Sequence, residues 1–203
     1  MVVMSVFLKI DYRFVDEIVC CGDDHDYYLH AETIALDFDF DYENQFENIE
    51  KIRFIHDGKK APKGFVGPGI LSAPFLFIGN LFDKLIVNNS LYNYRILFYS
   101  FSSMFYLILS INLMTKTLKL MKIKYNFNHL LLFYLGSGVT YFAFERYSMS
   151  HAYEVFTASL VLYLSAKYYS NDNSKKYVVL IPLSIMLALL VRWVNYYVIF
   201  LPL

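Results

Sequence analysis

The sequence predicts an all-α integral membrane protein, a polytopic helical bundle with about four to five spans and a first outer loop that carries interfacial amphipathic helices. Three observations predict this class. Of the 203 residues, 57% are hydrophobic and 19% are aromatic. The mean hydropathy of +0.39 is too high for an ordinary soluble domain of this length. Long apolar runs alternate with short lysine-rich segments, as membrane helices alternate with their cytoplasmic loops.

Charge and cysteine content exclude some classes of function. The 18 Lys and Arg residues balance the 18 Asp and Glu residues, so no global basic field indicates a nucleic-acid partner. Cys20 and Cys21 are the two cysteines and are adjacent, so they cannot close a disulfide loop or supply a multi-cysteine zinc site.

The chain divides into two parts. Residues 1–92 are interpreted as a truncated first helix followed by an outer catalytic loop with juxtamembrane helices, and residues 93–203 as a transmembrane bundle that is incomplete at its C-terminus. The apolar run at residues 1–10 has about half the roughly 20 residues that a span needs. We therefore expect the chain to be a fragment.

The segment from Gly22 to Glu32 is the most polar feature of the first part. It places three carboxylates and two imidazoles within eight positions, namely Asp23, Asp24, His25, Asp26 and His30. Helical spacing then puts Tyr27, Tyr28, Ala31, Ile34, Ala35 and Phe38 on one stripe. Asp23 and Asp24 therefore start a helix, where backbone N–H groups and the helix dipole favour negative charge. The simplest interpretation is that Asp23 caps this helix.

Two loops and one helix follow. The alternation from Asp37 to Glu43 suits an extended segment within a solvated loop, with its acids on one face. Turn-forming residues are frequent from Lys59 to Gly69. The next helix, from near Pro68 to about Val87, contains Pro74 and several polar residues, so we expect it to lie in or dip into the membrane interface.

The second part contains the predicted spans. These are about Arg95 to Met114, Leu130 to Phe144, Ala152 to Ala166, Tyr177 to Val191, and the start of a further span from Tyr196 to Leu203. Lysines without acids after the first span mark the cytoplasmic side, and Lys167, Lys175 and Lys176 mark it again.

This topology predicts a shared outer face. It carries residues from well-separated segments of the chain: Asp23, Asp24, Lys63, Glu145, Arg146, His151 and Arg192. Charged groups near hydrocarbon are costly unless they are paired or functional. Anchoring of helix ends would explain Arg146 or Arg192 alone, but it does not explain acids and a histidine beside them.

These residues resemble a known family. Asp23 and Asp24, followed by Tyr27 and Ala31, look like the Asp-Glu-x-x-Tyr-x-x-x-Ala motif in the first outer loop of GT-C glycosyltransferases, in the branch of the protein O-mannosyltransferases and lipid A aminoarabinose transferases. The resemblance continues with Lys63 ahead of an apolar interfacial helix, with the corner of Arg146, Ser148, Ser150 and His151, and with Arg192. Asp24 replaces the usual Glu, and Gly64 stands where relatives often have Pro.

The resemblance implies transfer of a sugar from a polyprenyl phosphate donor to a glycan, lipid or protein acceptor on the outer face of the membrane. Asp23 would serve as general base or acceptor-positioning carboxylate, and Asp24 would assist. Lys63, Arg146 and Arg192 would bind the lipid phosphate.

Other roles and classes stay open. His151 and Glu154 could contact the acceptor or a metal, and a divalent cation is the one cofactor considered. The location implied is a multi-pass protein of a bacterial inner membrane, with the site facing the periplasm or exterior and in contact with membrane lipid. The alternatives are a non-enzymatic carrier or structural subunit, and an inactive transferase fragment.

Overall fold

The structure is a computed structural model that describes residues 18, 22–46, 55–86, 93–170 and 174–202. The described chain is mostly helical. Its elements, in order, are α2 (Gly22–Glu32), the π-helix η2 (Thr33–Asp37), β1 (Ile55–His56), β2 (Lys59–Lys60), α3 (Val66–Leu85), α4 (Tyr94–Leu120), α5 (Phe127–Gly136), α6 (Gly138–Phe144), α7 (His151–Ser170), α8 (Lys175–Val191) and the 3-10 helix η4 (Trp193–Phe200). The strands β1 and β2 form a small antiparallel hairpin.

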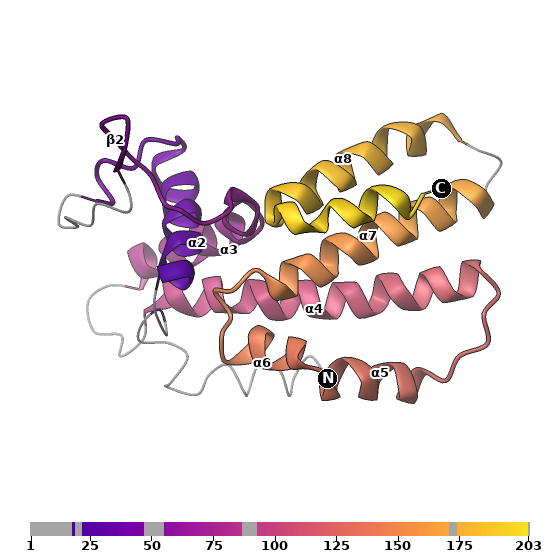
Figure 1. The fold of residues 1–203 in the computed structure, drawn as a ribbon. Helices are drawn as coiled ribbons and strands as arrows, with labels where there is room; N and C mark the ends of the chain where they lie inside the picture. Colours follow the sequence, from indigo (N-terminus) through magenta and orange to yellow (C-terminus); the bar gives the residue numbers. More distant parts are fainter. Residues whose placement is uncertain (1–17, 19–21, 47–54, 87–92, 171–173, 203) are drawn as a thin grey trace.

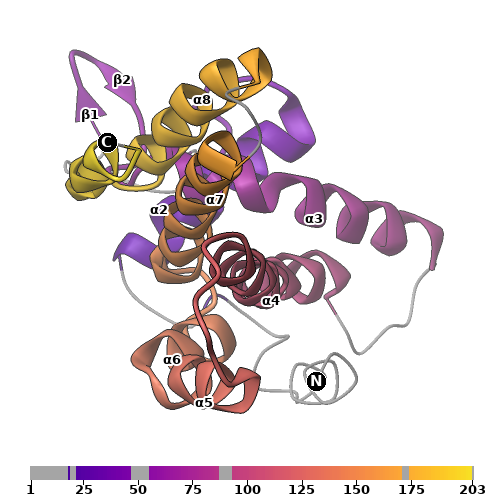
Figure 2. The same ribbon diagram turned by 90° about the vertical axis from the view of Figure 1, so that its right-hand side faces the viewer.

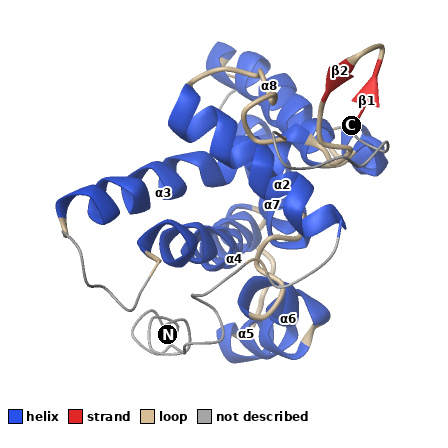
Figure 3. Cartoon of the chain, turned by 90° about the vertical axis from the view of Figure 1, so that its left-hand side faces the viewer, coloured by secondary structure: helices blue, strands red, loops and turns tan. Residues whose placement is uncertain are grey.

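The long helix α4 is the centre of the arrangement (Figure 1). Helix α7 packs along one side of α4, and α8 and η4 pack on α7. Helices α5 and α6 follow one another along the other side of α4, where Leu107 and Ile111 meet Tyr134 and Ala143. Helices α2 and α3 cross each other at one end of the bundle (Figures 2 and 3).

The two ends of the bundle differ in charge. The lysine-rich end of α4, the end of α7 and the start of α8 lie together at one end (Figure 1). Helix α2, the corner between α6 and α7, and the end of α8 lie at the opposite end. The two lysine-rich segments therefore share an end, as the sequence predicts.

Two helices of the described chain are long and apolar enough to cross a membrane by length and composition, and they are α3 and α4. Helix α4, at 27 residues, is about 40 Å long. Helix α3 runs through Pro74 over 20 residues, close to the predicted range, but it is long and apolar enough to cross a membrane, whereas the sequence predicts an interfacial position. Asp83, near its end, accepts hydrogen bonds from the backbone N–H groups of Tyr94 (3.0 Å) and Arg95 (3.1 Å), and thereby caps α4.

Two local predictions are wrong, and a third is right only in part. The run from Leu130 to Phe144 is two short helices, because Ser137 between two glycines takes an extended conformation that ends α5. The start of the last predicted span is instead the 3-10 helix η4, which folds back along α8. The alternating run from Asp37 lies in an exposed loop, as predicted, but it is not extended, because Asp39 and Asp41 accept hydrogen bonds from the backbone two residues on and so form side-chain turns.

The stripe on the first helix is shorter than predicted. Ala31 and Ala35 are buried, but Phe38 adopts a left-handed conformation and is 75% exposed. The interpretations of residues 1–10 and of Cys20 and Cys21 concern positions outside the described residues, as does the boundary at residue 92.

Candidate active site at the charged end of the bundle

The first turn of α2 supplies one side of the site. Helix α2 begins at Gly22, so Asp23 lies inside the first turn and not at the N-cap as predicted. Asp23 is exposed. Asp24 lies on the buried face with Ala31 and is 1% exposed. Both carboxylates are near the positive end of the helix dipole.

Asp24 is held by the corner between α6 and α7. Arg146 Nη2 donates a hydrogen bond to Asp24 Oδ2 at 2.5 Å, and Ser148 Oγ donates to the Asp24 backbone oxygen at 2.7 Å. The Tyr99 hydroxyl of α4 lies 2.8 Å from Ser148 Oγ. Burial raises the pKa of Asp24 above its ordinary value, although the hydrogen bond and charge of Arg146 lower it. The hydrogen bond to Asp24 in turn raises the pKa of Arg146.

Glu154, in the first turn of α7, is the centre of a second group. Its Oε1 accepts a hydrogen bond from Ser150 Oγ at 2.5 Å and one from Arg192 Nη1 at 3.3 Å. His151 Nδ1 lies 3.7 Å from the same oxygen. Arg192 reaches Glu154 because it directly follows α8, which packs against α7.

Tyr27 joins the two groups. The Ser150 side chain lies within hydrogen-bonding range of the Tyr27 hydroxyl, and the charges of Asp23, Arg192 and Glu154 all act on that hydroxyl. Burial raises the pKa of Tyr27, so it remains a neutral donor near pH 7. We call this set of residues the charged cluster: Asp23, Asp24, Tyr27, Arg146, Ser150, His151, Glu154 and Arg192.

Lys63 lies beside this cluster on an exposed loop. It precedes Gly64, which packs so closely on α2 that an added Cβ would lie 2.9 Å from Asp26 Cβ and 3.1 Å from Tyr27 Cε1. No ion pair joins Lys63 to another residue of the described chain. The Lys63 side chain is exposed.

His30 fixes the position of that loop. Its Nε2 lies 2.9 Å from the Gly64 carbonyl oxygen and its Nδ1 lies 2.7 Å from the Tyr42 hydroxyl. A carbonyl can only accept, so Nε2 carries the proton and Nδ1 of the neutral ring accepts from Tyr42. Burial lowers the pKa of His30 and favours this neutral form.

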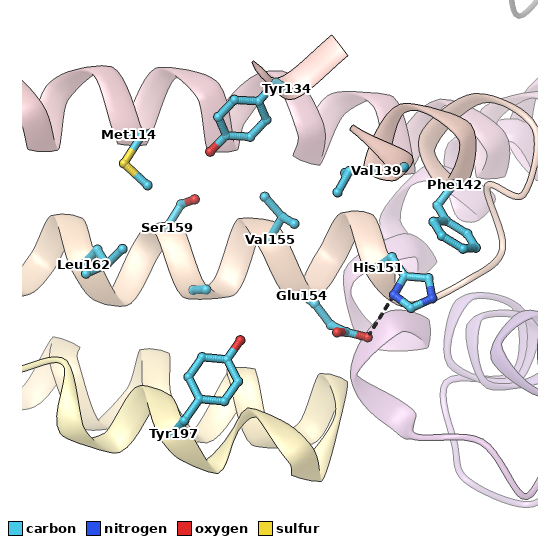
Figure 4. Close-up of a pocket in the computed structure, with 12 residues that line it drawn as sticks. Met114, Tyr134, Val139, Phe142, His151, Glu154, Val155, Ser159, Leu162 and Tyr197 are labelled. Carbon is cyan, nitrogen blue, oxygen red and sulfur yellow. Dashed lines mark ion pairs between the residues drawn. The ribbon is translucent and has the colours of Figure 1, made fainter. Parts of the chain in front are cut away.

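An apolar groove runs from the charged cluster along α7. It has a volume of about 450 Å³. Figure 4 shows His151 and Glu154 at one end and Met114 and Leu162 toward the other. The His151 ring packs on Phe142, with ring centroids 4.0 Å apart. The groove therefore joins a charged mouth to apolar walls.

Every site residue predicted from the sequence lies at this end of the bundle. Neither Lys63 nor Asp23 forms an ion pair with another residue of the described chain. Sequence reasoning missed the roles of Tyr99 and His30. Tyr99 is one of 19 tyrosines, and nothing in its neighbourhood distinguishes it. His30 is identified from the sequence only as one of two imidazoles in this segment, and its place next to the buried stripe of α2 is the signal that could have indicated its structural role.

Within the described residues, no group of three or more His, Cys, Asp and Glu side chains is arranged to hold a metal ion. His151 and Glu154 would supply only two ligands.

Comparisons of this chain with protein-family models, with characterised proteins and with solved structures find no match.

Proposed function

We propose that this chain is part of a GT-C-type membrane glycosyltransferase that moves a sugar from a polyprenyl phosphate donor to a glycan, lipid or protein acceptor. The observation that carries the proposal is the convergence of side chains from four separate segments. Asp23, Asp24 and Tyr27 come from α2, Arg146 and Ser150 from the corner before α7, Glu154 from α7, and Arg192 from the end of α8.

The position of the cluster supports an outer-face reaction. It lies at the end of the bundle opposite the lysine-rich segments (Figure 1). Lysine-rich segments favour the cytoplasmic side, so the charged cluster is proposed to face the periplasm or exterior of a multi-pass protein in a bacterial inner membrane.

The groove suits a lipid-linked donor. Its walls include Met114, Val155 and Leu162, which would pack against a polyprenyl chain. His151 and Glu154 lie at its mouth, where the phosphate and sugar of such a donor would emerge. A soluble nucleotide sugar would have no use for an apolar groove that joins the cluster.

The proposed chemistry is a displacement at the anomeric carbon. The acceptor hydroxyl or amine attacks that carbon, the bond from carbon to the phosphate oxygen breaks, and the lipid phosphate leaves with the electron pair. Asp23 takes the acceptor proton, because it is the exposed carboxylate of the cluster. Cations beside the leaving phosphate stabilise its growing negative charge.

The three predicted cations differ in availability. Lys63 has no described ion-pair partner, and Arg192 shares one oxygen of Glu154 at 3.3 Å. Arg146 is bound to Asp24 at 2.5 Å. We therefore assign phosphate binding mainly to Lys63 and Arg192, and we assign to Arg146 the positioning of Asp24.

The test is transfer of labelled sugar from a panel of polyprenyl phosphate donors, in membranes of cells that express the natural gene. Asp23→Asn should lower the rate by about a hundredfold to ten-thousandfold, the usual cost of losing a general base. Its membrane level should be normal, because the exposed Asp23 side chain contributes only about 0.3–1 kcal/mol through the helix dipole.

The matched control is Asp39→Asn, an exposed acid in the loop after α2, which should keep the full rate. Near-normal transfer by Asp23→Asn would remove Asp23 from the mechanism. Failure of wild-type membranes to use any donor, despite normal insertion, would contradict the transferase proposal and favour a carrier or structural subunit.

A further inference from the structure

A second cavity lies at the end of the bundle opposite the charged cluster. It has a volume of about 580 Å³ and lies between the ends of α4, α7 and η4. Leu120, Leu162, Ala166 and Leu201 are among its walls, and the exposed Lys122 and Tyr169 lie at its edge. We call it the lysine-end cavity. The Tyr169 hydroxyl donates to the Pro202 carbonyl oxygen and so ties the end of α7 to the segment after η4.

Among the described residues, the charged side chains at the segment ends near this cavity are lysines. Four lysines occur between Thr115 and Tyr125 without an acid among them, namely Lys116, Lys119, Lys122 and Lys124. The last turn of α7 adds Lys167. Apolar walls with Lys122 at the edge and further lysines on the adjoining segments match a molecule that has a hydrocarbon chain and an anionic headgroup.

The backbone at Lys122 supports a role for its side chain. Lys122 has φ +57°, in the left-handed region, and follows the C-cap residue of α4. The Ile123 N–H donates to the Leu118 oxygen at 3.0 Å and the Lys122 N–H donates to the Lys119 oxygen at 3.1 Å. These two bonds form a Schellman motif, in which glycine is the favoured residue at the position of Lys122. A lysine at this position has a strained backbone conformation, and its side chain places a cation at the cavity edge.

We propose that the lysine-end cavity binds an anionic phospholipid, with an acyl chain against Ala166 and Leu201 and the headgroup phosphate at Lys122. This inference rests on the membrane location within the proposed function and is independent of sugar transfer. The bound lipid would fill the space between α4, α7 and η4 and so hold these helix ends together.

The test is equilibrium binding of radiolabelled phosphatidylglycerol to the purified protein in neutral detergent micelles, with phosphatidylcholine as the competing lipid. We expect the wild type to prefer phosphatidylglycerol. Lys122→Gly should fold at least as well, because glycine relieves the left-handed strain, yet it should bind phosphatidylglycerol about fivefold more weakly. Lys122→Gln should show a similar loss.

Lys124→Gln is the matched control, because Lys124 is an exposed lysine two residues away that does not line the cavity. It should change binding by less than about twofold. Equal losses in the Lys122 and Lys124 variants would show general surface attraction and overturn the proposal. Equal affinity for the two lipids would overturn it as well, as would full competition by soluble glycerol phosphate, which lacks acyl chains. A protein that binds phosphatidylglycerol at Lys122 but transfers no sugar would leave this inference standing while the transferase proposal fails.

Discussion

At the scale of single residues, the clearest structural feature of the charged end is the ion pair between Asp24 and Arg146. The Asp24 carboxylate is almost fully buried, and in the described structure it pairs with the Arg146 guanidinium. Removing one member of a buried pair costs about 3–5 kcal/mol, because the remaining charge lies in a medium of low dielectric constant.

We therefore expect Arg146→Met to lower the free energy of unfolding by about 3–5 kcal/mol at neutral pH. Without the guanidinium the pKa of Asp24 should rise further, so its proton should bind as the pH falls and the deficit should shrink toward acid pH. Thermal unfolding in detergent at several pH values measures this.

Two variants serve as controls for that prediction. Asp24→Asn combined with Arg146→Met should be more stable than Arg146→Met alone, because the uncompensated buried charge is gone. Lys60→Met breaks the pair with Glu43, at 3.5 Å, in which the carboxylate is exposed, and should change stability by less than about 1 kcal/mol. Equal losses from Arg146→Met and Lys60→Met would contradict the importance of burial.

His30 gives a second prediction at this scale. Burial lowers its pKa in the folded protein, whereas in the unfolded chain the pKa is about 6.5. The unfolded state thus binds a proton first, so the contribution of His30 to stability is complete above pH 6.5 and is lost as the pH falls toward the folded pKa. The melting temperature of His30→Gln should therefore fall less steeply than that of the wild type between about pH 7 and pH 5.

His129→Gln is the control for His30, since His129 is exposed and should leave the wild-type slope intact. Identical slopes in wild type and His30→Gln would mean that His30 is not the group that titrates.

At the scale of elements, the apolar pattern predicts where most helices lie. Helices α2, α4, α7 and α8 all occur where the spacing or the length of an apolar run places them. The break at Ser137 was not predicted, because a run of apolar residues does not report the backbone angles of one serine between glycines. The π-helical continuation of α2 was missed for the same reason, since residue types there remain compatible with an ordinary helix.

Glycines determine how the elements cross. At Gly67, where α3 meets the end of α8, an added Cβ would lie 2.3 Å from the Val191 backbone nitrogen. Backbone cannot move aside as a flexible side chain can, so Gly67→Ala must push α3 and α8 apart. The displacement would also move Arg192, the residue after Val191, away from Glu154.

We expect Gly67→Ala to lower the free energy of unfolding by about 1–3 kcal/mol and to lower the rate of the proposed sugar transfer. Gly136→Ala is the matched control, because a Cβ there meets nothing within 4 Å, and it should leave stability and transfer near wild type. Thermal unfolding and donor turnover would be measured in parallel. A stable Gly67→Ala protein would show that the crossing of α3 and α8 is looser than its backbone contact indicates.

At the scale of the whole molecule, the lysine distribution along the sequence predicts that the residues of the charged cluster lie together at the end opposite the lysine-rich segments, and they do. It does not predict their pairing. Asp24 and Arg146 are 122 positions apart, and Arg192 and Glu154 are 38 apart. Which acid meets which base depends on how α2 crosses α3 and how α7 turns after α6. Those contacts arise from side-chain packing, which no single-residue pattern specifies.

The two-ended arrangement makes a prediction about membrane topology. Single cysteines are placed at Asp39, in the exposed loop after α2, and at Lys124, beyond the end of α4, with Cys20 and Cys21 replaced by serine. A membrane-impermeant thiol reagent should label Asp39→Cys in intact cells, whereas Lys124→Cys should react only after the membrane is permeabilised, because lysine-rich segments remain on the cytoplasmic side. Leu107→Cys, at a position that is 2% exposed, should react in neither case. Labelling of Lys124→Cys from outside as fast as Asp39→Cys would place both ends of the bundle on one side. The charged cluster would then lose its proposed position on the outer face, and the proposed polyprenyl phosphate donor could not reach Lys63 and Arg192 from that face.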